Sequence, residues 1–311
     1  MKYIFSIFIF MHGAIHIMGF LKGFKIAQIS NLQTDISPVS GIFWLIAFLL
    51  FAISAVGFAL GKDFWLFLVV PALIISAFLV ISTWSDAKFG MIPNLIILAI
   101  AIFSFSSCSM NKMITRETEE ILNAAKTSEP VIITEADIQE LPAPVQQWMR
   151  STGIIGKPAI NAARVSQKAL MEMKPEQQDW QTAEAEQYTT TNPPAFIWTV
   201  NMKMAPLIKI KGRDKFVAGK GEMLIKMNSL IKIVNEKGTR MDEGTLQRFL
   251  GELVWFPSLA LSPYISWEAI DDSSAKATMN YKETTGSGTF YFNENGDFVK
   301  FVALRFMGNK P

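Results

Sequence analysis

The sequence predicts an α-helical membrane bundle of four spans followed by an α+β domain, in which a large curved antiparallel sheet, or half-barrel, carries a lid helix. Long apolar runs occur only in the first 110 residues, and each approaches the roughly 20 residues needed to cross about 30 Å of hydrocarbon. The four runs are residues 3–20, 41–60, 64–83 and 91–108. After residue 160, apolar and polar residues alternate as in half-buried strands.

These patterns divide the chain into three parts. We expect a transmembrane domain at residues 1–110, a helical linker and entry segment at 111–160, and an antiparallel sheet domain at 161–311. In the linker, Pro130 ends a polar helical extension, and Thr134 precedes an acidic turn as an N-cap does.

The charge and cysteine content exclude several classes of function for the sheet domain. Five basic and three acidic residues precede residue 111, out of totals of 29 and 27, so 24 of each sign follow it. A neutral domain does not attract nucleic acid, and we expect no nucleic-acid partner. Cys108 is the one cysteine, and both histidines lie near the N-terminus. The residues after 110 therefore cannot form a disulfide, a cysteine metal site or a Ser/His/Asp triad among themselves. We predict no catalytic residue, metal or cofactor, and the sequence favours no enzyme activity.

The first span holds both histidines, His12 and His16, four residues apart on one helical face. Ionisable residues inside a span are costly and face the bundle interior. The pair either forms hydrogen bonds between helices or holds a haem or metal ion. If all four runs span, His16, Asp86 and Asn94 gather on the same side of the membrane. We therefore predict an intramembrane polar cluster of His12, His16, Asp86 and Asn94, in which a contact between His16 and Asp86 is geometrically possible.

Nine strands and one helix are predicted after residue 160. The strands are residues 162–173, 181–188, 196–204, 207–211, 219–227, 230–234, 274–282, 288–292 and 298–306. Turn residues at 235–238 and 293–296 separate some of them, and the second turn predicts a terminal hairpin. The helix at 244–254 has an apolar face, and its Arg248 and Glu252 are spaced as an i, i+4 pair.

The lid helix is followed by aromatic residues that suggest a ligand site. Trp255, Phe256 and Trp267 either anchor the lid to the sheet or, if the sheet is hollow, line an apolar pocket. Arg248 and Glu252 form either a surface ion pair or a buried pair inside that pocket. These five residues are the predicted ligand-binding residues.

Three blocks carry a resemblance to an uncharacterised bacterial multi-pass membrane protein family of unknown function. They are HGAIHIMGFLKGF near the start, LPAPVQQWMRSTGIIGKP after the membrane region, and LQRFLGELVWFPSLALSPYISWEAID late in the chain. The sheet domain is also similar, in strand order and lid pattern, to the lipoprotein-carrier fold of the periplasm, a half-barrel closed by a helix over an apolar cavity. This second resemblance implies an extracytoplasmic position for the large domain.

The leading functional hypothesis is a binding module in the cell membrane, with the bilayer and a lipid or lipoprotein ligand as partners. One alternative is a membrane redox or metal-binding component that uses His12 and His16. Another is a structural or signalling anchor without a ligand. Lysine and arginine residues are divided four against three between the two sides of the membrane, so they do not decide the orientation.

Overall fold

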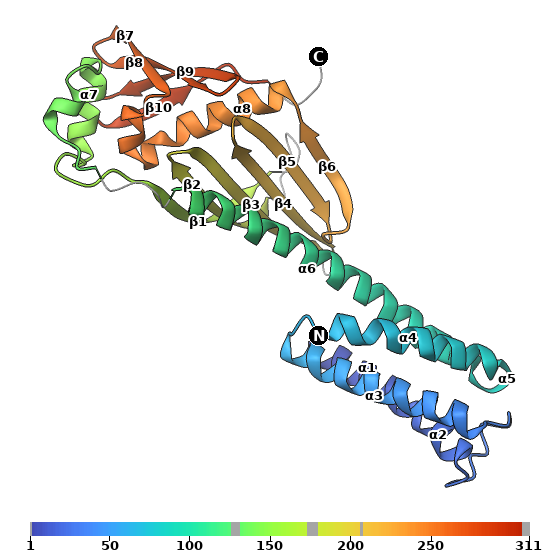
Figure 1. Ribbon diagram of the computed structural model, residues 1–311. Coiled ribbons are helices and arrows are strands. Elements are labelled where there is room, and N and C mark those ends of the chain that lie inside the picture. Colours follow the sequence, from blue (N-terminus) through green and yellow to red (C-terminus); the bar gives the residue numbers. More distant parts are fainter. Residues whose placement is uncertain (1, 126–130, 173–179, 206–207, 307–311) are drawn as a thin grey trace. The chain divides into compact units, whose positions relative to one another are not determined.

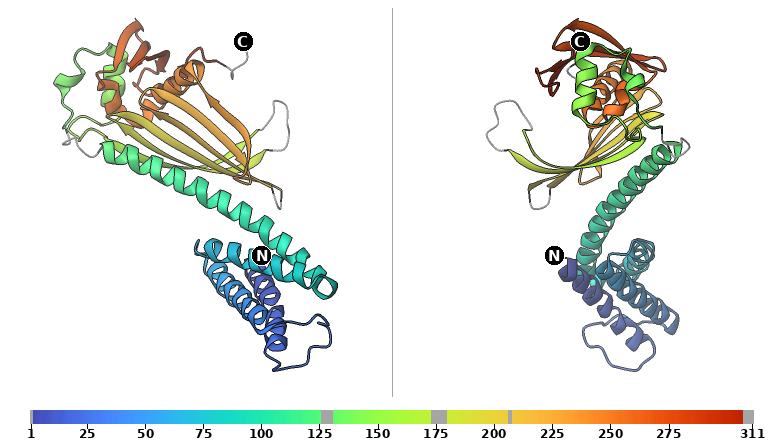
Figure 2. Two further views of the ribbon diagram at one scale, coloured as in Figure 1. Left: turned by 45° about the vertical axis from the view of Figure 1, so that its right-hand side comes forward. Right: turned by 90° about the vertical axis from the view of Figure 1, so that its left-hand side faces the viewer.

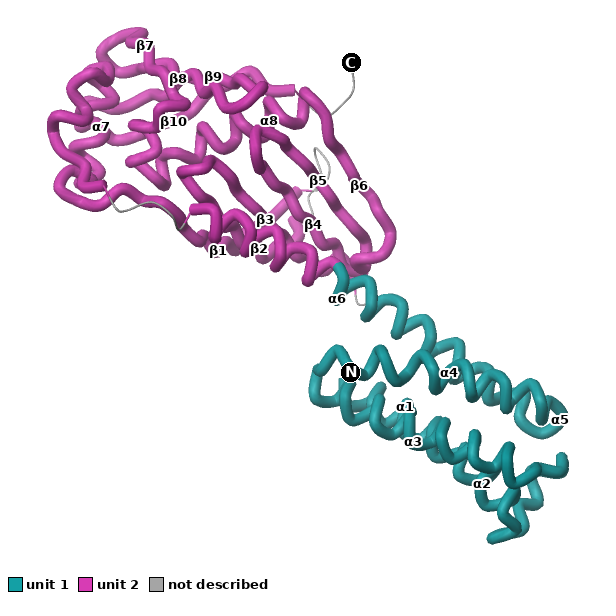
Figure 3. Tube along the Cα trace, viewed as in Figure 1, with its two compact units in different colours: residues 1–109 teal, residues 110–311 magenta. Residues whose placement is uncertain are grey.

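A computed structural model describes residues 2–125, 131–172, 180–205 and 208–306. The chain divides into two compact units, residues 1–109 and residues 110–311, shown in different colours in Figure 3. Each unit is described by itself below.

The first unit is a helical bundle with four segments long and apolar enough to cross a membrane. Its elements are α1 Lys2–Ile15, α2 Ile17–Gly23, α3 Pro38–Leu60, α4 Trp65–Ser82, α5 Trp84–Ala87, the 3₁₀ turn η1 Lys88–Gly90, and the first part of α6 Met91–Ala125. The first span is broken at His16, between α1 and α2.

Two glycines of the first span let α3 approach closely. A Cβ atom at Gly13 would lie 2.6 Å from the Cβ of Phe51, and one at Gly19 would lie 2.1 Å from the ring of Trp44. Small residues allow such close contact between membrane helices, where packing and polar contacts replace the hydrophobic effect.

The second unit contains two antiparallel sheets, with strand orders β1-β2-β3-β4-β5-β6 and β10-β9-β8-β7 (Figure 1). The strands are β1 Ala162–Met171, β2 Gln181–Thr191, β3 Pro194–Ala205, β4 Ile208–Val217, β5 Lys220–Met227, β6 Ile231–Lys237, β7 Ile265–Asp271, β8 Ser274–Tyr281, β9 Thr284–Phe292 and β10 Phe298–Val302. Within the described strands both sheets are open. The prediction of antiparallel strands is confirmed, including the terminal hairpin β9–β10.

The prediction of one large sheet is wrong, because the chain leaves the first sheet after β6. It passes through α8 Thr239–Gly251 and the 3₁₀ turns η3 Glu252–Trp255 and η4 Pro257–Leu261 before it forms the second sheet. The prediction also missed β7. Residues 235–237, expected in a turn between strands, are the last residues of β6, and Gly238 joins this strand to α8.

Helix α8 lies between the two sheets and forms the middle of three layers. Its residues Leu246, Phe249 and Leu250 are buried in one core with side chains of both sheets. A Cβ atom at Gly221 of β5 would lie 2.4 Å from Oγ1 of Thr245, and one at Gly286 of β9 would lie 2.7 Å from Cδ2 of Leu246. The helix therefore touches a sheet on each side, whereas the sequence predicted a lid on a single sheet.

The linker residues close this core at one end. A capping box at Thr134 and Asp137 begins the short η2 Glu135–Ile138, and α7 Ala143–Ser151 follows. Trp148 of α7 is buried, with its ring 5.9 Å from that of Phe292 on β9. The expected N-cap and entry helix are thus present, whereas Pro130 lies outside the described residues.

The two faces of the six-stranded sheet have different neighbours (Figure 2). We call the face that carries Phe196 and Phe216 the inner face; it is concave and packs on α8. The outer face carries Ala195 and Ile197, which pack on Ile121 of α6.

Buried charges join α6 to the outer face. Glu117 of α6 lies 3.2 Å from Nε of Arg213 and 2.8 Å from Nζ of Lys215. Glu117 and Nε of Arg213 are within ion-pair distance, but their contact does not have the geometry of a hydrogen bond. Both basic side chains also pair with Glu222 of β5, at 3.1 and 3.3 Å, and Lys237 lies 2.7 Å from it. Desolvation opposes the ionisation of Glu222, but these three basic groups together lower its pKa to about 2.

We expect the contribution of Glu222 to stability to disappear in acid. Its pKa is lower in the folded state than the usual 4.5, so the stabilisation is present above that value and is lost as the pH falls from 4.5 towards 2. Glu222→Gln should therefore lower the denaturation midpoint of the full chain at pH 7, with a difference from the wild type that shrinks below pH 4.5. Glu268→Gln, at an exposed ion pair, is the control and should change little at any pH. A constant difference for Glu222→Gln would contradict the charge argument.

Candidate functional site

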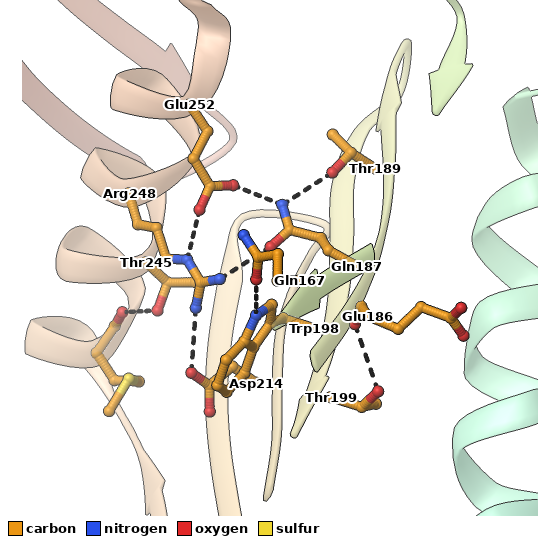
Figure 4. A network of polar contacts seen from close by, with 11 residues as sticks. Gln167, Glu186, Gln187, Thr189, Trp198, Thr199, Asp214, Thr245, Arg248 and Glu252 are labelled. Atoms are coloured by element: carbon orange, nitrogen blue, oxygen red, sulfur yellow. Dashed lines mark hydrogen bonds and ion pairs between the residues drawn. The ribbon is translucent and has the colours of Figure 1, made fainter. Parts of the chain in front are cut away.

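The most extensive polar network between α8 and the inner face of the six-stranded sheet surrounds Arg248 (Figure 4). Helical spacing directs Arg248 and Glu252 to the same side of α8, towards the sheet. Gln187 of β2 and Asp214 of β4 lie two residues from Thr189 and Phe216, respectively. Because alternate residues of a strand face the same side, Gln187 and Asp214 also point to the inner face.

Arg248 is held by three polar partners. Its Nε lies 2.7 Å from Oε1 of Glu252, its Nη1 lies 3.2 Å from Oδ2 of Asp214, and its Nη2 donates to Oε1 of Gln187 at 2.8 Å. The amide of Gln187 in turn donates to Oε2 of Glu252 at 2.5 Å and to Thr189 at 3.0 Å. The predicted i, i+4 pair is therefore part of a network that also includes two strands.

Aromatic rings support the same guanidinium group. Its centre lies 4.8 Å from the ring of Phe196 and 5.1 Å from that of Trp198. Trp198 also donates from Nε1 to Oε1 of Gln167 on β1, at 3.0 Å. Contacts between arginine and an aromatic ring are worth most where water is excluded.

The network is close to electrically balanced. Burial raises the pKa of Asp214 above its usual range, and the positive charge of Arg248 opposes this shift. The three hydrogen bonds of the Arg248 side chain all go to carboxylate or amide oxygens, and the exposed Arg305 is a second cation close enough to act on Asp214, Arg248 and Glu252. The described residues contain no group of three or more His, Cys, Asp or Glu side chains that suits a metal ion. This chemistry is suited to fixing α8 on the sheet and to orienting polar groups.

An apolar surface continues from this network along the inner face. We call it the methionine strip. Its members are Ala169, Met171, Ala183, Ala185, Val200, Met202, Met204, Ile210, Ile225 and Met227. Five are buried and five are half-buried, and no residue of α8 belongs to this cluster. Trp198 packs against both this cluster and the core around α8.

Sequence reasoning missed the methionine strip, although a signal was present. Met202 and Met204 occupy alternate positions of one strand, which places them on the same face. The strip becomes visible only when the strands are aligned, for example where Met202 pairs with Ala183 on one side and with Ile210 on the other.

The predicted aromatic residues lie elsewhere. Phe256 is buried in the core around α8, and Trp267 packs on Phe290 with a ring distance of 5.3 Å while its Nε1 donates to the carbonyl of Ala260. Trp255 is 45% exposed. The structure therefore brings Arg248 and Glu252 together, whereas these three aromatic residues are not part of their polar network.

In the membrane unit, His12 and His16 meet Asn94 of α6 and Ser76 of α4. His12 Nε2 lies 2.8 Å from Oδ1 of Asn94, and His16 Nε2 lies 2.9 Å from Oγ of Ser76. Asp86 is not in this group; its carboxylate accepts from the backbone N–H of Thr34 at 2.7 Å. The structure thus brings together three of the four predicted residues. His16 contacts Ser76 and not Asp86, the contact that the sequence analysis considered.

The hydrogen bonds determine the positions of the imidazole protons. His16 Nδ1 faces the carbonyl oxygen of His12 at 3.1 Å and must donate, so its Nε2 accepts from Ser76 in a neutral ring. His12 Nε2 faces the amide oxygen of Asn94 and must donate, which leaves an unprotonated Nδ1. Among the described atoms, the buried Nδ1 of His12 has no hydrogen-bond partner.

Removal of Arg248 should destabilise the sheet unit strongly. Arg248→Met leaves the carboxylates of Asp214 and Glu252 buried without their cation, which typically costs about 3–5 kcal/mol. Arg164→Met is the matched control, because Arg164 is 60% exposed and its partner Glu186 is 35% exposed, and it should cost no more than about 1 kcal/mol. Denaturant unfolding of the full chain in detergent, followed by near-UV circular dichroism, measures both. Equal losses for the two variants would contradict the buried network.

Comparisons with known proteins bear on the same part of the chain. Neither the curated proteins nor the solved structures contain a match. The model of a family of unknown function, DUF6544, matches residues 131–311. This range includes the second and third sequence blocks and both sheets. The expected membership of an uncharacterised family is supported, whereas the carrier-fold resemblance stays a prediction. The chain belongs to DUF6544, a family of unknown function.

Proposed function

We propose that the protein is a membrane-anchored binding module that holds an acyl chain, as a lipid or a lipidated partner, on the methionine strip. The observation that carries this proposal is the strip itself: an apolar lining on a concave face, at the end of which lies a set of oriented polar groups. Sites for small molecules are mostly apolar, with few polar groups that set orientation.

The side chains of the strip suit a flexible, variable ligand. Four of its ten members are methionines, whose unbranched thioether chains adapt to irregular apolar shapes. The members of the strip on β1 and β2 are mostly alanines, whose side chains are small. An acyl chain needs contact area and no directional bonds, which is what these residues offer.

The network around Arg248 gives the proposed site a polar end. Trp198 belongs to both clusters, and its indole N–H is directed to Gln167. A ligand along the strip would therefore place its head group near the amides of Gln167 and Gln187. The extracytoplasmic position of this unit is part of the proposal and rests on the carrier-fold resemblance.

A charge on the strip should reduce lipid contact. Met171 and Leu170 are neighbours on β1 that point to opposite faces, and only Met171 belongs to the strip. The full chain in nanodiscs is irradiated with a phospholipid that carries a diazirine on its acyl chain, and labelled peptides are identified by mass spectrometry. We expect labelling of the peptides around Met202 and Met227, and a decrease of about tenfold for Met171→Glu, as a loss of about 1.4 kcal/mol would produce.

Leu170→Glu, on the 64% exposed neighbour, should leave the labelling unchanged. Labels found only in the first unit, or equal decreases for the two variants, would overturn the proposed function.

A second candidate function is favoured by the free Nδ1 of His12. We propose as the alternative that this buried lone pair binds a guest in the membrane unit, such as a haem as an axial ligand or a metal ion with exchangeable ligands. A neutral imidazole nitrogen is a common metal ligand, and its tautomer is set by the bond that the other nitrogen makes, here to Asn94.

Detergent-purified full chain tests this alternative. We expect haem absorbance, or one equivalent of metal by elemental analysis, in the wild type and its loss in His12→Ala and His12→Gln. Trp84→Phe, at an exposed position, is the control. Absence of both signals in folded wild-type protein would eliminate this candidate without affecting the acyl-chain proposal.

A further inference from the structure

A row of lysines without acidic partners crosses one end of the six-stranded sheet. Residues 201–212 and 223–235 contain five lysines and no aspartate or glutamate. The five are Lys203, Lys209, Lys211, Lys226 and Lys232, and we call them the lysine row. In the strand register Lys203 is opposite Lys209, and Lys226 is opposite both Lys211 and Lys232.

Within the described part of the chain, no member of the lysine row forms an ion pair. The lysine row and the network around Glu117 both lie on the outer face, but the carboxylates of this network form ion pairs with Arg213, Lys215 and Lys237. Lys211 contacts only the amide oxygen of Asn111, and burial lowers its pKa. Like charges directly opposite one another destabilise a sheet, so this arrangement favours an external anion.

Exposed apolar residues stand at the same end of the sheet. Because the six strands form a meander, the ends of β1, β3 and β5 and the starts of β2, β4 and β6 lie together there. Large apolar side chains at or next to the starts of β2, β4 and β6 are exposed: Trp180 is 56% exposed, Ile208 is 42% exposed, and Leu230 and Ile231 are 40% and 53% exposed. Tryptophan and aliphatic side chains beside lysines are typical of surfaces that insert shallowly into a bilayer interface.

This end of the sheet contacts a residue that is close along the chain to the fourth apolar run. Asn111, the partner of Lys211, follows Cys108 at the end of the fourth apolar run by three residues of the continuous helix α6. At 1.5 Å per residue this separation is about 5 Å along the helix axis. The attraction of an anionic membrane surface extends over about 8–10 Å at physiological salt.

We propose that this end of the sheet docks on the bilayer that anchors the chain, with the lysine row on anionic phospholipid head groups and with Trp180, Ile208, Leu230 and Ile231 in the interface. Residues of the methionine strip reach the same end, since Met171, Met204 and Met227 lie at the corresponding ends of β1, β3 and β5. Docking thus also gives an acyl chain a short path from the bilayer to the strip; this last step rests on the proposed function, whereas the docking does not.

A pair of matched positions tests the docking in the full chain. Ile231 and Ile270 are 53% and 55% exposed, and Ile270 lies on β7 of the other sheet. In a Cys108→Ser background, Ile231→Cys and Ile270→Cys are each labelled with an environment-sensitive nitrobenzoxadiazole dye. The protein is reconstituted into phosphatidylcholine vesicles with or without phosphatidylglycerol, and with lipids that carry a doxyl quencher.

We expect quenching of the dye at position 231 and not at position 270, with stronger quenching when phosphatidylglycerol is present. Lys209→Glu with Lys232→Glu should remove the dependence on phosphatidylglycerol, because each lysine at an anionic surface changes the docked ratio about fivefold. Equal quenching at the two positions, or quenching that ignores lipid charge in the wild type, would overturn the docking. In the wild type, docking without acyl-chain labelling of the strip would overturn the proposed function alone.

Discussion

The architecture of the sheet unit depends on the packing of α8 between two sheets. Gly221 and Gly286 remove the side chains that would hold the helix away, and Thr245 and Leu246 fill the space from the helix. Because the helix is covered on both sides, it carries buried residues around most of its circumference. The same insertion explains why the strands separate into two sheets, and it places Arg248 against the inner face of the first.

Charged side chains occupy three different environments on the six-stranded sheet. On the inner face, Arg248 donates hydrogen bonds to two carboxylates and one amide. On the outer face, Glu117 and Glu222 compensate Arg213 and Lys215 where α6 packs. At the end of the sheet, the lysine row lacks such compensation among the described residues. Buried charges need partners within the fold, whereas exposed charges are stable in water and remain available to a partner outside it.

Local sequence patterns were sufficient to predict much of the secondary structure. Period-two alternation predicted strands of both sheets, and the terminal hairpin followed from its turn residues. Strand β7 was missed because Pro263 and the apolar residues before it interrupt the alternation. The start of α8 was placed five residues late, since Thr239 and the polar residues after it lack an apolar periodicity.

The sequence by itself determined the four apolar helices, the antiparallel strands and the pairing of Arg248 with Glu252, because each depends on spacing along one segment. Only the tertiary structure decided which residues meet across segments. Asp214 is 34 residues from Arg248, Gln187 is 61 residues from it, and Asn94 is 82 residues from His12. The methionine strip and the lysine row likewise arise from strand register, which is set by the packing of whole faces and is not encoded in the neighbours of any one residue.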